Sequence, residues 1–380
     1  MAGGERMSGQ KNSRSIPFFN YPALYNQNEQ ELSELVLNVL RRGAYIMQRD
    51  LEEFETSLAT YLGVRHAIGV ADGTMAIHFG LRAAGVGPGD EVLVPSHTFV
   101  ATAAAVAHTG AKPVLVDCGT DHLIDPASAS RFITSRTKAI LPVQLNGRTA
   151  DMTAIGKLAD THGLQIVEDS CQALGSKFDG RFAGTFGVAG SFSFYPSKTL
   201  GCFGDGGAVV TDDDAAAAMM RELRDHGRGA DGLIHRFGFN ARLDNLQAAV
   251  LNYRLKHYGA VIERRRAIAR LYQNRLQGLG ELLLPPGPDA NAAHFDIYQN
   301  YEIEADRRDA LRDHLTNSGV GTILQWGGKC IHQFPDLGLG ADLPYTERMT
   351  QRFLMLPLNL AVSDDDVNYV CDRIVEFYRG

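Results

Sequence analysis

The spacing of hydrophobic residues changes along the chain. From residue 29 to residue 62, apolar side chains recur every three or four positions, a pattern typical of amphipathic helices. From residue 67 onward, short apolar runs typical of strands alternate with helical patterns. Seven strands are predicted in this way, over residues 67–70, 91–95, 113–117, 139–144, 165–168, 190–194 and 208–211.

Helical patterns occupy several of the intervals between the predicted strands. They cover residues 74–84, 99–109, 152–162 and 213–225. Strand, helix and strand at this spacing predict an α/β fold, with a mainly parallel seven-stranded sheet covered by helices on both faces. Such sheets bind ligands beyond the carboxyl ends of their strands, so polar residues at those ends are the first candidates for a site.

The last third of the chain predicts a second, smaller α/β domain. A long amphipathic helix is expected over residues 243–276, broken or bent near Gly259, and a proline-rich loop follows at 282–289. A strand at 298–303 and helices at 307–319 and 364–378 come next. We therefore expect a flexible tail at 1–15, an N-terminal arm and large domain at 16–250, and the linking helix with the small C-terminal domain at 251–380.

Composition narrows the class of protein. Of the 380 residues, 44% are hydrophobic and 21% are charged, which is typical of a globular chain. The net charge of −7 and the lack of a long basic run argue against nucleic acid as the main partner. The first 15 residues lack the apolar stretch of a signal peptide, and no apolar window is long enough to span a membrane. A soluble, cytoplasmic protein without membrane contact is expected.

The cysteines do not form a recognisable metal or disulfide pattern. Five of them are scattered along the chain without Cys-x-x-Cys spacing. Such a sparse, odd-numbered set fits reduced thiols in the cytosol better than disulfides or zinc. No metal site is expected. The five are Cys118, Cys171, Cys202, Cys330 and Cys371.

A lysine follows the sixth predicted strand in an enclosed loop. The aromatic run ends at Pro196, and Lys198 comes next among small residues. A lysine in such surroundings loses its charge more easily, which suits an amine that bonds covalently to a carbonyl carbon. The glycines within 201–207 allow the backbone to approach the same place closely. The alternative interpretation is a surface lysine in a turn.

Asp169 and Gln172 follow the strand predicted at 165–168. A carboxylate at that position can keep a pyridine nitrogen protonated, which lets pyridoxal 5′-phosphate (PLP) act as an electron sink. Gln172 can reach the ring oxygen of the same cofactor from the following turn. The alternative for Asp169 is a cap on the next helix.

Two further strand ends supply complementary groups. Gly73 and Thr74 open a helix, where free backbone N–H groups, the helix dipole and a hydroxyl can bind a phosphate, although the same residues also suit a plain turn and cap. Phe99 can stack on a flat ring or else pack in the core. Together the four strand ends offer a phosphate cradle, a stacking ring, a pyridine partner and an amine.

Longer motifs around these residues closely resemble the DegT/DnrJ/EryC1/StrS aminotransferases. The matching motifs are residues 89–99, 167–173, 192–198, 204–211 and 239–249, and the resemblance runs from residue 16 to the C-terminus. It implies PLP fold type I, which is aspartate-aminotransferase-like, and a homodimer with shared active sites. The implied cofactor contacts are Gly73, Thr74, Phe99, Asp169, Gln172, Ser193, Lys198 and Asn240.

The resemblance also assigns a role to each of these residues. Lys198 would be the catalytic lysine that holds PLP covalently, with Asp169 at the pyridine nitrogen and Gln172 near the ring hydroxyl. Phe99 would lie on the ring face. The phosphate would be contacted by Gly73, Thr74 and Ser193, and from the second subunit by Asn240.

Some positions depart from the family pattern or lie where its substrate contacts fall. Asp72 stands where Asn or Ser often precedes the Gly-Thr pair, which leaves the phosphate donors intact. Gln144 replaces a common His, so the contacts to the sugar or the amino donor are uncertain there. In the second domain Trp326, Lys329 and His332 are candidates to touch the sugar or its diphosphate. Alternatively, Trp326 packs between the domains and Lys329 is solvated.

The implied reaction is amino transfer from L-glutamate to a nucleotide-linked keto-deoxy sugar, with Lys198 as the base. The run at 200–207 favours the 3-keto over the 4-keto branch of the family. Two alternatives are a sugar dehydratase, which carries His in place of the lysine, and a non-catalytic PLP-binding regulator. A nicotinamide oxidoreductase is poorly supported, because the glycines at 85–89 precede a strand and do not follow one.

Overall fold

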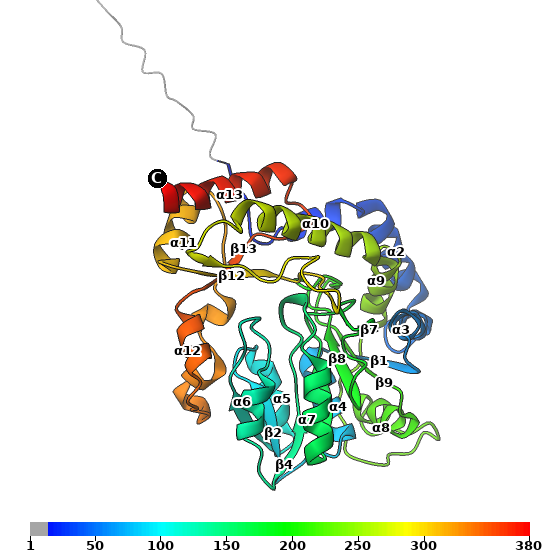
Figure 1. Ribbon diagram of the computed structural model, residues 1–380. Coiled ribbons are helices and arrows are strands. Elements are labelled where there is room, and N and C mark those ends of the chain that lie inside the picture. The colour runs from blue at the N-terminus through cyan, green and yellow to red at the C-terminus, as the bar shows by residue number, and fades with distance from the viewer. Residues whose placement is uncertain (1–13) are drawn as a thin grey trace, which may run out of the picture.

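Seven strands form the central sheet of the computed structural model, which describes residues 14–380 (Figure 1). Their order across the sheet is β1-β9-β8-β5-β4-β2-β3. β9 runs antiparallel to both of its neighbours and all other pairs are parallel, which confirms the predicted mainly parallel sheet. The strands are β1 His66–Val70, β2 Glu91–Pro95, β3 Lys112–Val116, β4 Thr137–Ile140, β5 Gln165–Asp169, β8 Ala189–Ser193 and β9 Gly207–Thr211.

Burial on both faces explains why strand β2 is apolar from Val92 to Pro95. Val92 and Val94 pack with Ile77 on one face of the sheet, whereas Leu93 packs with Ile155 on the other. Successive side chains of a strand point to opposite faces, so a sheet covered by helices on both sides needs a continuous hydrophobic run. The covering helices are α4 Gly73–Ala83, α5 Val100–His108, α6 Pro126–Arg131, α7 Met152–His162 and α8 Asp214–Arg224.

Each of the two long helical patterns forms two helices. The pattern over 29–62 forms α2 Glu29–Arg42 and α3 Arg49–Leu62, because Gly43 ends α2 with a φ of 63°. The pattern over 243–276 forms α9 Asn245–Lys256 and α10 Tyr258–Leu276. The break falls at His257, so the break or bend expected near Gly259 is two residues too late. A short helix, α1 Tyr21–Asn26, precedes these elements.

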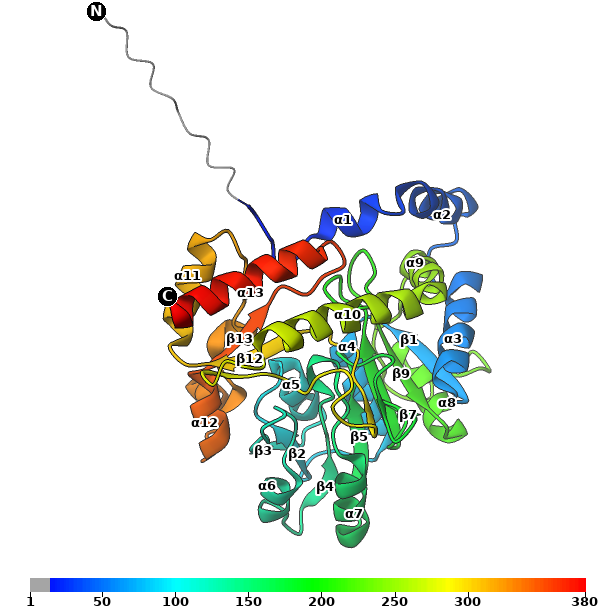
Figure 2. The same ribbon diagram turned by 45° about the horizontal axis from the view of Figure 1, so that its top comes forward.

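A small domain is built around a second, antiparallel sheet. β12 (Tyr301–Ala305) lies between β10 (Leu282–Leu283) and β13 (Phe353–Leu356). Helix α10 packs against α13, and the two lie side by side over this sheet (Figures 1 and 2). The rings of Tyr272 and Tyr301 stack at 4.9 Å in the core between α10 and β12. The other helices of this domain are α11 Arg308–Asn317, α12 Pro344–Thr350 and α13 Asp364–Arg379.

Several short strands and helices complete the fold. A third small sheet has the order β11-β6-β7. Its strands are β11 His294–Phe295, β6 Lys177–Phe178 and β7 Arg181–Phe182. The single-turn 3-10 helices are η1 Leu145–Gly147, η2 Gln325–Gly328, η3 Ile331–Gln333 and η4 Pro335–Leu337.

The first described residues are anchored to the small domain. Arg14 donates hydrogen bonds to Asp365 and Asp366 of α13 at 2.9 and 2.6 Å, and Ile16 is buried in the core of the small domain. The end of the expected flexible tail, at Arg14, is therefore held against α13 by hydrogen bonds. Residues 1–13, which make up the rest of that tail, lie outside the described residues.

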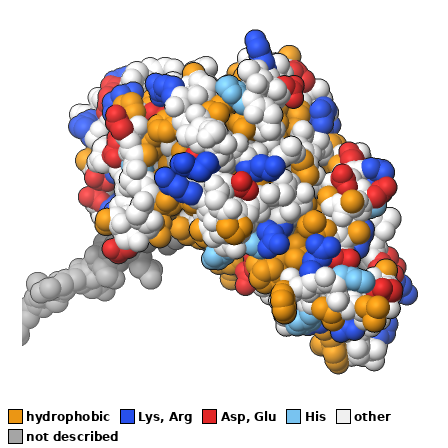
Figure 3. Space-filling model, turned by 90° about the horizontal axis from the view of Figure 1, so that it is seen from below, with side chains coloured by type: hydrophobic (Ala, Val, Ile, Leu, Met, Phe, Trp, Pro, Cys, Tyr) orange, Lys and Arg blue, Asp and Glu red, His pale blue; other side chains and the backbone are white. Residues whose placement is uncertain are grey.

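The surface carries side chains of every kind. On the face seen in Figure 3, basic and acidic side chains are interspersed with hydrophobic ones. Single exposed apolar side chains are normal on protein surfaces. None of the helices formed by residues 14–380 combines the length and the apolar character needed to cross a bilayer.

Candidate active site

A cavity of about 540 Å³ lies at the carboxyl ends of the parallel strands. Its walls come from the loops after β1, β2, β4, β5 and β8, and from residues 323–326 and Met355 of the small domain. The sheet thus brings together residues that are far apart in the sequence. Of the expected site residues, those that line the cavity are Gly73, Thr74, Phe99, Asp169, Gln172, Ser193, Lys198 and Trp326.

Gln299 holds the loop that carries Lys198 from both sides. The Nε2 atom of Gln299 donates to the carbonyl oxygen of Ser197 at 2.8 Å, and its Oε1 atom accepts from the N–H of Thr199 at 2.8 Å. The backbone N–H of Lys198 donates to the carbonyl oxygen of Tyr195 at 2.8 Å. Lys198 therefore lies in a hydrogen-bonded turn, where it is half-buried and lines the cavity.

The surroundings of Lys198 favour its neutral form. Burial lowers the pKa of its amine, an effect that the nearby Cys171 and Asp169 only partly oppose. An amine that loses its proton more easily is both a better nucleophile and a better base. Lys198 therefore has the chemistry that covalent bonding to an aldehyde requires.

The carboxylate of Asp169 is oriented by two hydrogen bonds. Its Oδ2 atom accepts from the Thr102 hydroxyl at 2.7 Å, and its Oδ1 atom accepts from the N–H of Cys171 at 3.1 Å. The Thr102 hydroxyl is itself 2.7 Å from that of Thr98. Turns and the short strand β6 follow β5, so Asp169 is not the cap of a next helix. A carboxylate held in this way can face a pyridinium N–H.

The start of helix α4 forms a tight cradle. Asp72 caps the helix, since its side chain accepts from the N–H of Met75 at 2.8 Å. A Cβ atom on Gly73 would approach Cys171 Sγ to 2.8 Å and Ser193 Cβ to 2.9 Å, so only glycine fits there. Thr74 and Ser193 add hydroxyls beside the free N–H groups of the first turn. Such a helix start suits a phosphate.

Phe99 and Gln172 present groups that a flat, polar ring could use. Phe99 is 54% exposed and lines the cavity, so the alternative of a core phenylalanine is wrong. Gln172 Oε1 accepts from the N–H of Asn146 at 2.9 Å, with Asn300 Nδ2 at 3.4 Å. Because this network assigns Oε1 to those donors, the NH₂ end of Gln172 remains available to donate to a ring oxygen.

Gln144 does not line the cavity, contrary to the expectation of a substrate contact. Its side chain is fully buried. The Nε2 atom donates to Glu168 Oε2 at 2.8 Å, and the Oε1 atom accepts from the N–H of Ala150 at 2.7 Å. Its neighbours Val143 and Leu145 line the cavity instead. Neighbouring residues of an extended chain point to opposite sides, which explains the difference.

Lys329, His332 and Asn240 also lie outside the cavity of the single chain. His332 is buried, with Nδ1 2.6 Å from the Ser96 hydroxyl and Nε2 2.9 Å from Glu347 Oε1. It therefore links β2 to α12 and does not face a ligand. Lys329 is exposed, with its Nζ 5.8 Å from the ring centre of Phe334. Asn240 is exposed on the surface after α8.

Several cavity residues could not be singled out from the sequence. Thr102 lies within a helix of small residues, and its hydroxyl gives no local signal. The others come from the small domain or from loops whose positions depend on it. They are Asn300, Ile323, Gln325 and Met355. Asp72 and Asp205 also line the cavity.

The residues present fit each part of PLP. The α4 cradle suits its phosphate, Phe99 its ring face, Asp169 its pyridine nitrogen, the Gln172 NH₂ its ring oxygen, and Lys198 its aldehyde. The fold and the cavity together define a PLP-dependent enzyme of fold type I. The chain belongs to the DegT/DnrJ/EryC1/StrS aminotransferase family, whose model matches residues 26–375. It is a PLP-dependent sugar aminotransferase.

Named relatives and a solved structure cover almost the whole chain. A dTDP-3-amino-3,4,6-trideoxy-α-D-glucose transaminase of Streptomyces venezuelae is 40% identical over 98% of this chain and 98% of its own. A "pleiotropic regulatory protein" of Geobacillus stearothermophilus is 37% identical over 96% of this chain and 99% of its own. The crystal structure of S. venezuelae DesV in complex with a ketimine intermediate has a TM-score of 0.92 at 40% identity, covering 96% of this chain and 99% of that one.

Proposed function

We propose that this enzyme moves the amino group of L-glutamate to the keto carbon of a nucleotide-linked 3-keto-deoxy sugar. The products are 2-oxoglutarate and a 3-amino sugar. The observation that carries the proposal is the half-buried Lys198, with a lowered pKa, in a cavity of about 540 Å³ that also holds Asp169. The 3-position is supported by the name of the S. venezuelae relative, a 3-amino sugar transaminase.

In this proposal the residues of the chain have separate tasks. When bound, PLP supplies an aldehyde that takes up the amino group and a ring that delocalises electrons. Lys198 Nζ would remove the proton from the α-carbon of the donor, and would later give a proton to the former keto carbon of the sugar. Asp169 Oδ2, oriented by Thr102, keeps the ring nitrogen protonated. Gln172 donates to the ring oxygen.

We further propose a homodimer in which each subunit completes the site of the other. Asn240 lies outside the cavity of its own chain and is exposed, as expected of a residue that reaches the phosphate of the partner's cofactor. The segment 226–240 next to it carries apolar side chains in water. They are Leu233, 64% exposed, Ile234, 58% exposed, and Phe237, 101% exposed. A second copy covering this segment would remove an unfavourable apolar surface.

The proposal also covers the cellular compartment and one contact to the sugar. All five cysteines are free thiols within the described residues, which suits the reducing cytoplasm. Trp326, half-buried in the small-domain wall of the cavity, is the remaining candidate for contact with the sugar. It packs at 5.0 Å against the ring of His97, so its position depends on the domain seam.

The two alternatives lead to different products. A dehydratase of this family would carry His at position 198, where this chain has Lys. The other alternative, a regulator without catalysis, matches the name of the G. stearothermophilus relative but not the aminotransferase family to which the chain belongs. It would bind PLP without turnover. Formation of an amino sugar therefore separates the proposal from both alternatives.

The test uses the PLP-loaded enzyme in two half-reactions. L-glutamate alone should bleach the visible band of the bound cofactor and release one 2-oxoglutarate per site. Addition of a dTDP- or UDP-linked 3-keto sugar should restore the band, whereas the 4-keto isomer should not. Bleaching by another amino acid only would reject glutamate as the donor. Restoration only by the 4-keto sugar would reject the 3-position.

A further inference from the structure

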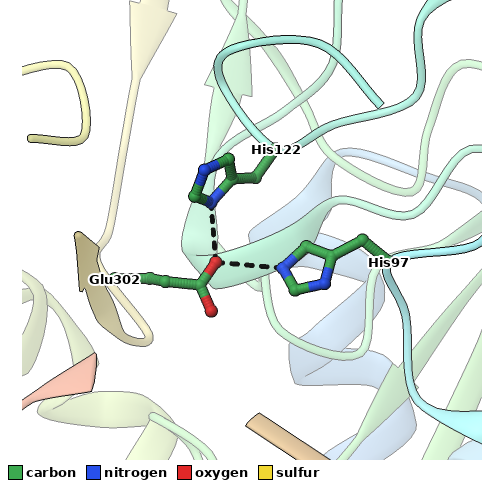
Figure 4. A group of neighbouring side chains, drawn as sticks. All are labelled: His97, His122 and Glu302. Carbon is green, nitrogen blue, oxygen red and sulfur yellow. Dashed lines mark hydrogen bonds and ion pairs between the residues drawn. The ribbon is translucent and has the colours of Figure 1, made fainter. Parts of the chain in front are cut away.

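A carboxylate of the small domain is inserted among donors of the large domain. Glu302, on β12, is fully buried, and its Oε1 atom lies 3.0 Å from His97 Nε2, 2.7 Å from His122 Nδ1 and 3.1 Å from Asn146 Nδ2. Figure 4 shows both imidazoles pointing at this oxygen. His97, His122 and Asn146 follow strands β2, β3 and β4 in turn. One oxygen therefore ties three strand-end loops to the second domain.

The carboxylates of Glu302 and Glu304 are paired with cations, one of which, Arg352, also pairs with Asp306. His122 donates from both ring nitrogens, because its Nε2 atom also lies 3.2 Å from Glu304 Oε1. Burial disfavours the charged ring, yet the hydrogen bonds to Glu302 and Glu304 raise the pKa of His122 to about 9. Arg352 Nε provides a second cation, 3.0 Å from Glu304 Oε2. Glu302 and Glu304 are thus held with two cations in one network.

Asn146 connects this network to the cofactor site. Its side chain has no free polar atom, since Nδ2 donates to Glu302 and Oδ1 accepts from Gln325 at 2.6 Å and from Asn300 at 2.9 Å. The backbone of Asn146 is left-handed, with a φ of 56°. The N–H of the same residue donates to Gln172 Oε1 at 2.9 Å. Contacts that hold the Asn146 side chain also hold its backbone N–H, and through that N–H they hold the side-chain amide of Gln172.

We propose that Glu302 is a positioning residue, which acts through Asn146 to aim the NH₂ group of Gln172 at the ring oxygen of the cofactor. The inference rests on the proposed role of Gln172. Through this role the small domain would influence the cofactor, because Glu302 is part of strand β12. His122 and His97 hold the carboxylate in place, and Glu302 holds Asn146.

The expected consequence is a change in the acid–base behaviour of the bound cofactor. A donor at the ring oxygen draws charge away from it, and so weakens its attraction for the proton on the nitrogen that joins Lys198 to the cofactor. Loss of the charge-assisted hydrogen bond between Asn146 and Glu302 should raise the pH midpoint of the absorbance change of the bound cofactor by about one unit. This midpoint is read without substrate, so it does not depend on turnover.

The chain offers a matched control for this measurement. Glu302 and Glu304 lie on the same strand and both accept from His122, but only Glu302 contacts Asn146. Glu302→Gln should raise the spectral midpoint, whereas Glu304→Gln should lower thermal stability and leave the midpoint in place. Asn146→Gly tolerates the left-handed backbone and should raise the midpoint as Glu302→Gln does. The midpoint of the double variant, Glu302→Gln with Asn146→Gly, should shift no further than that of either single variant, because both changes break the same chain of hydrogen bonds.

The outcomes separate this inference from the proposed function. A Gln172→Ala variant with an unmoved midpoint would refute the role of Gln172 itself. A midpoint that moves in Gln172→Ala but stays in Glu302→Gln and in Asn146→Gly would refute the positioning role alone. His97, His122 and Glu302 also offer ligand atoms within 4.8 Å of one another. One zinc per chain in the purified holoenzyme, with a midpoint that shifts when a chelator removes it, would replace the hydrogen-bond explanation by a metal site.

Discussion

The hydroxyl of Thr102 donates to the Oδ2 atom of Asp169 at 2.7 Å. Thr102 is buried on the first turn of α5, and Asp169 is the last residue of β5. A helix that packs on the sheet thus orients the carboxylate that lies at the end of β5 and lines the cavity. Because the same hydroxyl also accepts from the hydroxyl of Thr98 at 2.7 Å, the Thr102 side chain is held at two points.

Replacing Thr102 by Val should slow the reaction. The change keeps the shape of the side chain and removes a hydrogen bond to a charged group, so kcat should fall by about 10- to 100-fold. Single-turnover kinetics with glutamate measure this directly. Thr109→Val is the matched control, because Thr109 is also buried next to α5 but bonds to the Val106 carbonyl oxygen. An equal loss of kcat in both variants would contradict an orienting role for Thr102.

Replacing Gly73 by Ala should weaken cofactor binding. The new methyl group would lie 2.8 Å from Cys171 Sγ and 2.9 Å from Ser193 Cβ, so the phosphate cradle must distort. The PLP dissociation constant should rise by about 10- to 100-fold, as overpacking predicts. The control is Gly259→Ala in α10, where a Cβ atom meets nothing within 4 Å. That variant should bind PLP normally and be up to about 1 kcal/mol more stable.

Stability should fall at alkaline pH because of His122. The pKa of His122 is raised in the folded protein from 6.5 to about 9, so its charge stabilises the fold fully below pH 6.5. This contribution, about 3 kcal/mol, is lost as the pH rises toward 9. Urea unfolding between pH 6 and 10 measures the loss. The loss should be absent in His122→Asn and unchanged in His108→Asn, whose side chain is exposed. The same slope in all three proteins would contradict the charged pair.

The proposed sharing of active sites between subunits predicts complementation between inactive subunits. Lys198→Ala removes the amine and Asn240→Asp places a like charge beside the phosphate of the partner's cofactor, so each variant alone should be inactive. In a mixed dimer, one of the two sites has both residues intact. Mixing the refolded chains should therefore recover about a quarter of the wild-type activity. No recovery, despite mass-spectrometric proof of mixed dimers, would place Asn240 outside the site of the other subunit.

The cofactor half of the site could be predicted from sequence because it comes from strand ends. Phe99, Asp169, Ser193 and Lys198 each lie at or just beyond the carboxyl end of a recognisable strand, and a parallel sheet brings such positions together. The prediction for Gln144 was wrong by one residue, because its neighbours Val143 and Leu145 line the cavity instead. The sequence marks where the strand ends but not which side the next residue faces.

The candidate substrate contacts were harder to predict from the sequence, for a physical reason. His332 and Lys329 lie in single-turn helices and loops whose path is fixed by contacts with distant residues such as Ser96 and Glu347. No local periodicity reports such contacts. Glu302 shows the same limit, because its three partners come from three loops of the other domain.

The most direct measurement is borohydride reduction of the PLP-loaded enzyme, followed by digestion and mass spectrometry. Reduction makes the bond between the lysine and the cofactor permanent. A single phosphopyridoxyl group on Lys198 is the predicted result. Labelling of another lysine, such as the exposed Lys329, or of none, would contradict the assignment of Lys198 as the residue that binds PLP.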